Sequence, residues 1–86
     1  MLYSFYHPIT DDPMAVSLAN VRDVRVMEDS TKSKRNPLRY AVRIVHFGES
    51  LPMVIDGLYH GDACELVEKI LKKIKENAWQ TANPVI

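Results

Sequence analysis

From Asp62 to Trp79 the chain reads DACELVEKILKKIKENAW, and this stretch decides the fold. Its apolar residues recur three and four positions apart, which is the spacing that places side chains on one face of an α-helix. The apolar residues are Ala63, Val67, Ile70, Ile74 and Ala78, with Leu66 and Leu71 beside them. The opposite arc is charged, and Glu65 stands in the favourable i, i+4 order before Lys69. We therefore predict an amphipathic helix from about Ala63 to Trp79.

The predicted helix has a start signal at an acidic residue. Asp62 can accept a hydrogen bond from a backbone amide of the first turn, and Glu65 can reach back, as in a capping box. The pattern predicts that Asp62 is the N-cap and that His60 lies before the helix.

The segments upstream have the composition of β-strands. In Leu38–Phe47, apolar and aromatic side chains occupy both alternating faces, which is typical of a central strand. A turn at 48–50 and a strand at Leu51–Ile55 complete a hairpin. Because Pro52 cannot donate a ladder hydrogen bond, this last strand lies at an edge or begins only at Met53.

Two further strands are predicted nearer the N-terminus, at Leu2–Tyr6 and Val16–Met27. Between them, Thr10-Asp11-Asp12-Pro13 has turn chemistry. The apolar alternation of Val16–Met27 slips near Ala19-Asn20, where either a bulge or a short turn is expected.

Four strands without helical crossovers, followed by one helix, predict an α+β fold. It is a four-stranded, mostly antiparallel β-sheet (a β-meander) covered on one face by a single C-terminal amphipathic helix. A chain of 86 residues forms one domain, 1–86, with a mobile basic loop at about 28–37 and a short C-terminal tail at 81–86.

The composition of the chain makes several classes of function less probable for this protein. The chain has 11 basic and 11 acidic side chains, so no net charge draws it to a polyanion or an anionic membrane. Its single cysteine cannot form an internal disulfide, which favours a reducing compartment. The N-terminus lacks the pattern of a signal peptide, and no stretch reaches the roughly 20 apolar residues of a membrane span. We expect a cytoplasmic protein with no membrane partner.

Catalytic and metal-binding patterns are weak. His60 and Cys64, with His7 or His46, could be metal ligands, but His60 lies outside the predicted helical register and no paired ligand motif supports a tetrahedral site. Cys64 could be a nucleophile in the first helical turn, whereas its place near the apolar stripe favours a buried, inert thiol. We expect no enzyme, no cofactor and no metal.

Two surfaces are candidates for binding. One helix can cover only one face of the sheet, so Ala41, Val45 and Phe47 are left on the other face, together with Val54 and Leu58. A homodimer, or a partner protein, would cover that face, and Trp79 at the helix end would extend the contact. We therefore expect a small non-enzymatic protein–protein interaction module.

The second surface is basic. Its residues are Arg25, Lys32, Lys34, Arg35, Arg39 and Arg43. They could hold phosphates, which makes a single-stranded DNA- or RNA-binding protein the alternative function. The other interpretation is a solvated loop that blocks pairing at the sheet edge.

The element order resembles two known folds in outline. A strand beginning Tyr40-Ala-Val-Arg-Ile-Val that leads toward an Asp62-capped helix is similar to the last part of bacterial pleckstrin-homology-like domains. A β-meander plus helix also resembles the dimeric single-stranded-DNA-binding coactivators. A resemblance of fold implies no functional residues.

Overall fold

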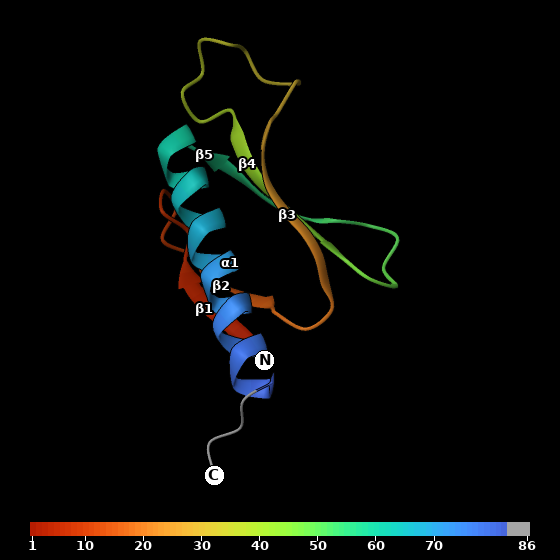
Figure 1. Ribbon diagram of the computed structural model, residues 1–86. Helices are drawn as coiled ribbons and strands as arrows, with labels where there is room; N and C mark the ends of the chain where they lie inside the picture. The colour runs from red at the N-terminus through yellow and green to blue at the C-terminus, as the bar shows by residue number, and fades with distance from the viewer. Residues whose placement is uncertain (83–86) are drawn as a thin grey trace.

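The computed structural model describes the backbone of residues 1–82 and the side chains of residues 1–77. In this part of the chain it contains five strands followed by one helix (Figure 1). The elements are β1 (Leu2–Tyr6), β2 (Pro13–Ser17), β3 (Val21–Glu28), β4 (Tyr40–His46), β5 (Met53–Leu58) and α1 (His60–Ala82). The expected α+β class, with antiparallel strands and one C-terminal helix, is confirmed.

The strands form two sheets rather than the single four-stranded sheet that the sequence suggested. β1 and β2 pair as a separate antiparallel hairpin, with Leu2 opposite Ser17 and Tyr6 opposite Pro13. The other sheet has the order β3-β4-β5. The reason is the conformation of Asn20, whose φ of 59° is left-handed, so the chain turns at the point where the alternation slips. Of the two expected alternatives at that point, the short turn is correct.

The three-stranded sheet contains two irregularities that set which residues face the helix. The register shifts between Val21 and Asp23, which leaves Arg22 as an extra residue in β3. A second shift accompanies Gly57, whose φ of 67° suits the left-handed position of a bulge. Beyond it β5 continues to Leu58, whereas the sequence pattern predicts that this strand ends at Ile55. β5 begins at Met53, which is one of the two alternatives predicted from Pro52.

The core lies between α1 and the inner face of this sheet. Alternating residues of the paired strands, including Val24, Val42, Ile44 and Ile55, supply the sheet side. The helix side consists of Ala63, Leu66 and Ile70, and the hairpin adds Val16 and Leu18. Of the apolar residues predicted for the helix, Ala63, Leu66 and Ile70 are therefore buried.

The start of the helix differs from the prediction. α1 begins at His60, and the amide of Ala63 donates to the carbonyl of Tyr59 at 3.0 Å. Asp62 therefore lies inside the first turn rather than at the N-cap, and Glu65 pairs forward with Lys69 at 2.9 Å instead of reaching back. The helix continues to Ala82, so residues 81 and 82 belong to it and not to a tail.

Two histidines join the hairpin to the three-stranded sheet. His7, which is 9% exposed, places Nε2 2.8 Å from the carbonyl of Asp56 at β5. Its Nδ1 accepts hydrogen bonds from two amides of the following turn, so Nε2 carries the proton and donates. At the other end, His46 Nε2 lies 3.0 Å from the carbonyl of Ser17. These contacts give His7 and His46 structural roles.

Candidate functional site

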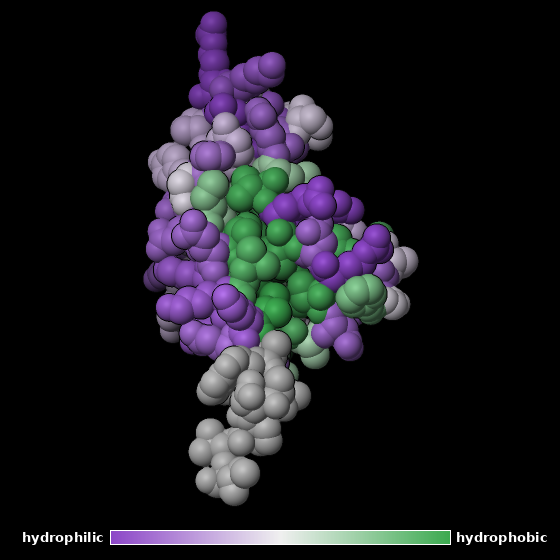
Figure 2. Space-filling model, in the orientation of Figure 1, coloured by the Kyte–Doolittle hydropathy of each residue, from purple (hydrophilic) through white to green (hydrophobic). Residues whose placement is uncertain are grey.

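An apolar strip remains uncovered on the helix side of the molecule. Figure 2 shows a continuous hydrophobic surface between α1 and β3, bordered by polar residues. We define this apolar strip as the partly exposed side chains of Val21, Val26, Val67, Leu71 and Ile74. Contiguous exposed apolar surface of this kind is typical of a binding site.

The geometry of the helix explains why the strip is open. At about 3.6 residues per turn, Leu71 lies about 100° around the helix from the fully buried Ile70. Its side chain therefore points past the edge of the sheet and is 48% exposed. The stripe of α1 is wider than the surface that β3 and β4 can cover.

The strip runs beside a free strand edge. β3 pairs only with β4 in the described sheet, so its other edge leaves backbone groups without a strand partner. At eight residues it is also the longest strand, and its bulge lies near one end, at Arg22. A long edge without an interior bulge or proline is open to pairing with another strand.

The predicted interface lies on the other side of the sheet. Ala41 and Val45 do share the outer face and Phe47 follows the end of β4, but Ala41 is only 1% exposed in the single chain. Val45 is half-buried, and Phe47 is 65% exposed. Leu58 is buried in the core, because the bulge at Gly57 turns it to the inner face. The outer face therefore offers fewer apolar side chains than the sequence suggested.

Charged residues divide this outer face. Arg25 lies opposite Arg43, and Arg43 lies opposite Val54 on the next strand. Asp23, two residues from Arg25, accepts a hydrogen bond from its Nε at 2.7 Å. The outer face is thus mixed, whereas the strip beside α1 is apolar. The remaining residue of the predicted interface, Trp79, lies outside the residues whose side chains the structure describes.

The predicted basic surface is divided between two places. Arg25 and Arg43 are cross-strand neighbours in the middle of the outer face. Lys32, Lys34 and Arg35 lie in the segment that connects β3 to β4. This segment is a series of turns rather than a regular element, and Asp29 begins it by accepting bonds from the amide and hydroxyl of Thr31. The Thr31 hydroxyl is the main reason that the pKa of Asp29 lies below its ordinary value.

Arg39, at the end of this segment, makes several contacts within the protein. Its Nε donates to Glu28 at 2.9 Å, Nη1 donates to the carbonyl of Asn36 at 3.0 Å and Nη2 donates to the Tyr40 hydroxyl at 2.8 Å. The guanidinium also lies 4.7 Å from the centre of the Tyr40 ring. With these contacts filled, Arg39 has little capacity left for an added anion. Lys32 is also engaged, since its Nζ donates to the Leu38 carbonyl at 3.3 Å.

His60 and Cys64 do share one helical face, contrary to the expectation that His60 lies outside the helix. The sulfur lies 3.7 Å from Nε2 and 3.9 Å from Nδ1, and the ring packs edge-on against Tyr40. Because the sulfur is almost equidistant from both nitrogens, it is aligned with the lone pair of neither. The arrangement therefore lacks the directed hydrogen bond of a thiol activated by a base. Cys64 is half-buried, not fully buried as the sequence favoured.

Other classes of site find little support in the described residues. Within them, no three histidine, cysteine, aspartate or glutamate side chains gather where they could hold a metal ion. No helix there is both long and apolar enough to cross a bilayer.

The sequence pattern does not predict the apolar strip. The available signal was the pair Leu66 and Leu71, which widens the stripe on both sides of Ile70. Nothing in the pattern showed where the sheet would end beneath the helix. No protein-family model, curated protein or solved structure matches the chain, so the geometry of its surfaces is the basis for a functional assignment.

Proposed function

We propose that the protein is a non-enzymatic interaction module that acts as a homodimer. A second copy covers the apolar strip and pairs with the free edge of β3. The observation that carries this proposal is the position of exposed apolar side chains, Leu71 above all, directly beside an unpaired strand edge. A strand added to such an edge gains backbone hydrogen bonds and places its alternate side chains against the apolar surface.

The charges of β3 support self-pairing. Two copies of β3 that run antiparallel about a two-fold axis at Val24 place Asp23 of each copy opposite Arg25 of the other. Opposite charges facing one another across strands stabilise a sheet, whereas like charges destabilise it. The result is a continuous six-stranded sheet, β5-β4-β3 followed by its symmetry copy. The three-residue unit Asp23-Val24-Arg25 is thus complementary to itself.

Light scattering at micromolar concentration tests the proposal. The natural chain should be a dimer, and Leu71→Glu should make it a monomer because a carboxylate would lie in the contact. The matched control is Val54→Glu, since Val54 has a nearly equal exposure of 47% but lies on the outer face. Both sites are half-exposed, so both variants should fold.

Three results would count against this interface. A natural chain that stays monomeric removes the homodimer. A dimer that survives Leu71→Glu but is broken by Val54→Glu places the contact on the outer face, as the sequence first suggested. A dimer that survives both substitutions uses neither surface.

A second candidate function is supported by the pairing of Arg25 with Arg43. Like charges directly opposite one another are unfavourable in a sheet, and only Arg25 has an ion pair among the described residues. A phosphate between the two guanidinium groups would relieve this repulsion, as in a single-stranded DNA- or RNA-binding protein. A labelled oligonucleotide should then bind with a steep salt dependence, and Arg43→Gln should weaken it. No binding at about 50 mM salt would exclude this candidate.

A further inference from the structure

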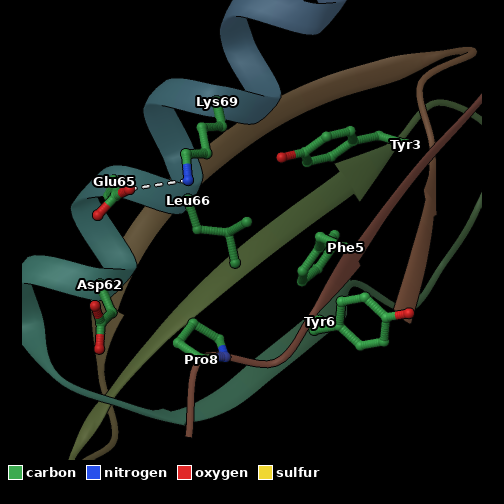
Figure 3. Close-up of a pocket in the computed structure, with 8 residues that line it drawn as sticks. All are labelled: Tyr3, Phe5, Tyr6, Pro8, Asp62, Glu65, Leu66 and Lys69. Atoms are coloured by element: carbon green, nitrogen blue, oxygen red, sulfur yellow. Dashed lines mark ion pairs between the residues drawn. The ribbon is translucent and has the colours of Figure 1, made fainter. Parts of the chain in front are cut away.

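A small cavity lies on the opposite flank of α1 from the apolar strip, between the helix and the β1–β2 hairpin. Its volume is about 250 Å³. Figure 3 shows aromatic side chains of β1 on one side and charged side chains of the first helical turns on the other. The aromatic residues are Tyr3, Phe5 and Tyr6, and the charged residues are Asp62, Glu65 and Lys69.

The aromatic side is formed by three ring side chains of β1. Tyr3 and Phe5 alternate along β1 and therefore point to the same side of the hairpin. Their rings are stacked, with centroids 5.5 Å apart and planes inclined by 26°. Tyr6 also lines the cavity and is 68% exposed, but it follows Phe5 directly, so its side chain leaves β1 on the other side. The faces of such rings carry negative electrostatic potential and attract cations.

The charged side is negative overall. Lys69 forms an ion pair with Glu65 at 2.9 Å, so these two charges cancel. The hydrogen bond to Glu65, and then its negative charge, raises the pKa of Lys69, so this ammonium stays charged. Asp62 makes no hydrogen bond or ion pair through its side chain within the described part of the chain. One carboxylate is therefore left without an ion-pair partner at the cavity.

We propose that this cavity binds a methylated ammonium group, either a quaternary ammonium or a methylated amine. Aromatic side chains and a carboxylate without an ion-pair partner favour a cation. The remaining lining is apolar, from Pro8 and Leu66, and disfavours a small, strongly hydrated ammonium ion. At about 30 Å³ per liquid water, the cavity has the room of about eight waters, enough for a trimethylammonium group and the start of its chain.

The same chemical group occurs on free small molecules and on methylated lysine side chains of proteins. The test therefore uses two probes, choline and a short peptide containing trimethyllysine, followed by amide chemical shifts in NMR spectra. Either probe should shift the resonances of Leu66 and its helical neighbours, and the one that binds more tightly identifies the source. The neutral isostere of choline, with a tert-butyl group in place of trimethylammonium, should bind at least about fivefold more weakly.

Two variants with matched controls test the site itself. Asp62→Asn should weaken binding by about fivefold, because it removes a charge about 4 Å from the cation. Asp56→Asn is its control, since Asp56 is an exposed carboxylate outside the cavity. Tyr6→Ala should also weaken binding, whereas Tyr59→Ala, at a 47% exposed tyrosine elsewhere, should not.

Several results would overturn the proposal. The proposal is overturned if neither probe shifts the cavity resonances at millimolar concentration, or if the neutral isostere binds as well as choline. It is also overturned if the shifts map to the apolar strip, or if Asp62→Asn and Asp56→Asn bind choline equally. These results are independent of the dimer, because the cavity and the strip lie on opposite flanks of α1.

Discussion

Leucine truncation at two positions of different burial gives a direct test of the packing. Leu58 ends β5 with its side chain 0% exposed, whereas Leu51, in the preceding turn, is 79% exposed. The same change, Leu58→Ala or Leu51→Ala, removes the same atoms in both cases. The difference between the two variants therefore measures mainly how closely each side chain is packed.

The expected loss follows from the atoms removed. Three buried carbon atoms at about 0.8 kcal/mol each amount to about 2.4 kcal/mol. An unfilled cavity raises the loss for Leu58→Ala to about 2.5–4 kcal/mol. With one fifth of its surface covered, Leu51 should lose about 0.5 kcal/mol or less on truncation.

Thermal unfolding followed by circular dichroism measures both values. At about 2.1 cal/mol/K per residue, unfolding of this chain carries an entropy of about 0.18 kcal/mol/K, so each kcal/mol lowers Tm by about 5 °C. Leu58→Ala should therefore lower Tm by about 12–20 °C and Leu51→Ala by at most about 3 °C. Both must be measured at one protein concentration, because a dimer makes Tm depend on it.

The decisive comparison is between the two variants. If they lose similar stability, Leu58 is not in the core and the bulge at Gly57 is misplaced. Should Leu58→Ala fail to fold, the volume-conserving Leu58→Met is informative, since it should lose less than about 1.5 kcal/mol.

Three further predictions concern the turns, the joint between the sheets and the helix surface. Asn20→Ala should destabilise the protein by about 1 kcal/mol and Asn20→Gly by less, because only glycine adopts a left-handed φ without strain. Chemical denaturation measures the free energy of unfolding of both variants. Equal losses would contradict a left-handed turn at Asn20. His7→Ala should lower the free energy of unfolding by about 1–3 kcal/mol, since two turn amides and a carbonyl at β5 lose their partner. His7→Asn can still accept hydrogen bonds from the turn amides, so it should recover part of this stability in the same assay. The hydrogen bond and charge of Lys69 hold the pKa of Glu65 below its ordinary 4.5, so this pair stabilises the fold above that pH and its contribution is lost as the pH falls through the lowered pKa. Glu65→Gln should therefore reduce the loss of stability on acidification, and Glu68→Gln, at a carboxylate without an ion pair in the described residues, should not.

The parts of the fold that depend on local pattern could be predicted from the sequence. The helix stripe through Ala63 and Ile70 and the two faces of β4 lie where the periodicity placed them. Both patterns are long and regular, so a shift of one or two residues at an end does not change which side chains are buried. The candidate cavity could not be predicted in this way. It brings β1 beside the start of α1, and no spacing within either segment encodes that contact.

Two of the misassigned features, the division into two sheets and the face on which Leu58 lies, have the same kind of cause, which is a residue in a left-handed conformation. At Asn20 it converts one predicted strand into two and detaches β2 from the main sheet. At Gly57 it adds a residue to β5, and since side chains alternate with a period of two, one added residue moves Leu58 from the outer face to the core. Removing Leu58 from the outer face weakens the case for an interface there. The exposed Leu71 beside β3 then becomes the stronger candidate. The choice between the outer face and the apolar strip for the proposed dimer interface therefore depends on two backbone turns, and the comparison of Leu71→Glu with Val54→Glu tests that choice.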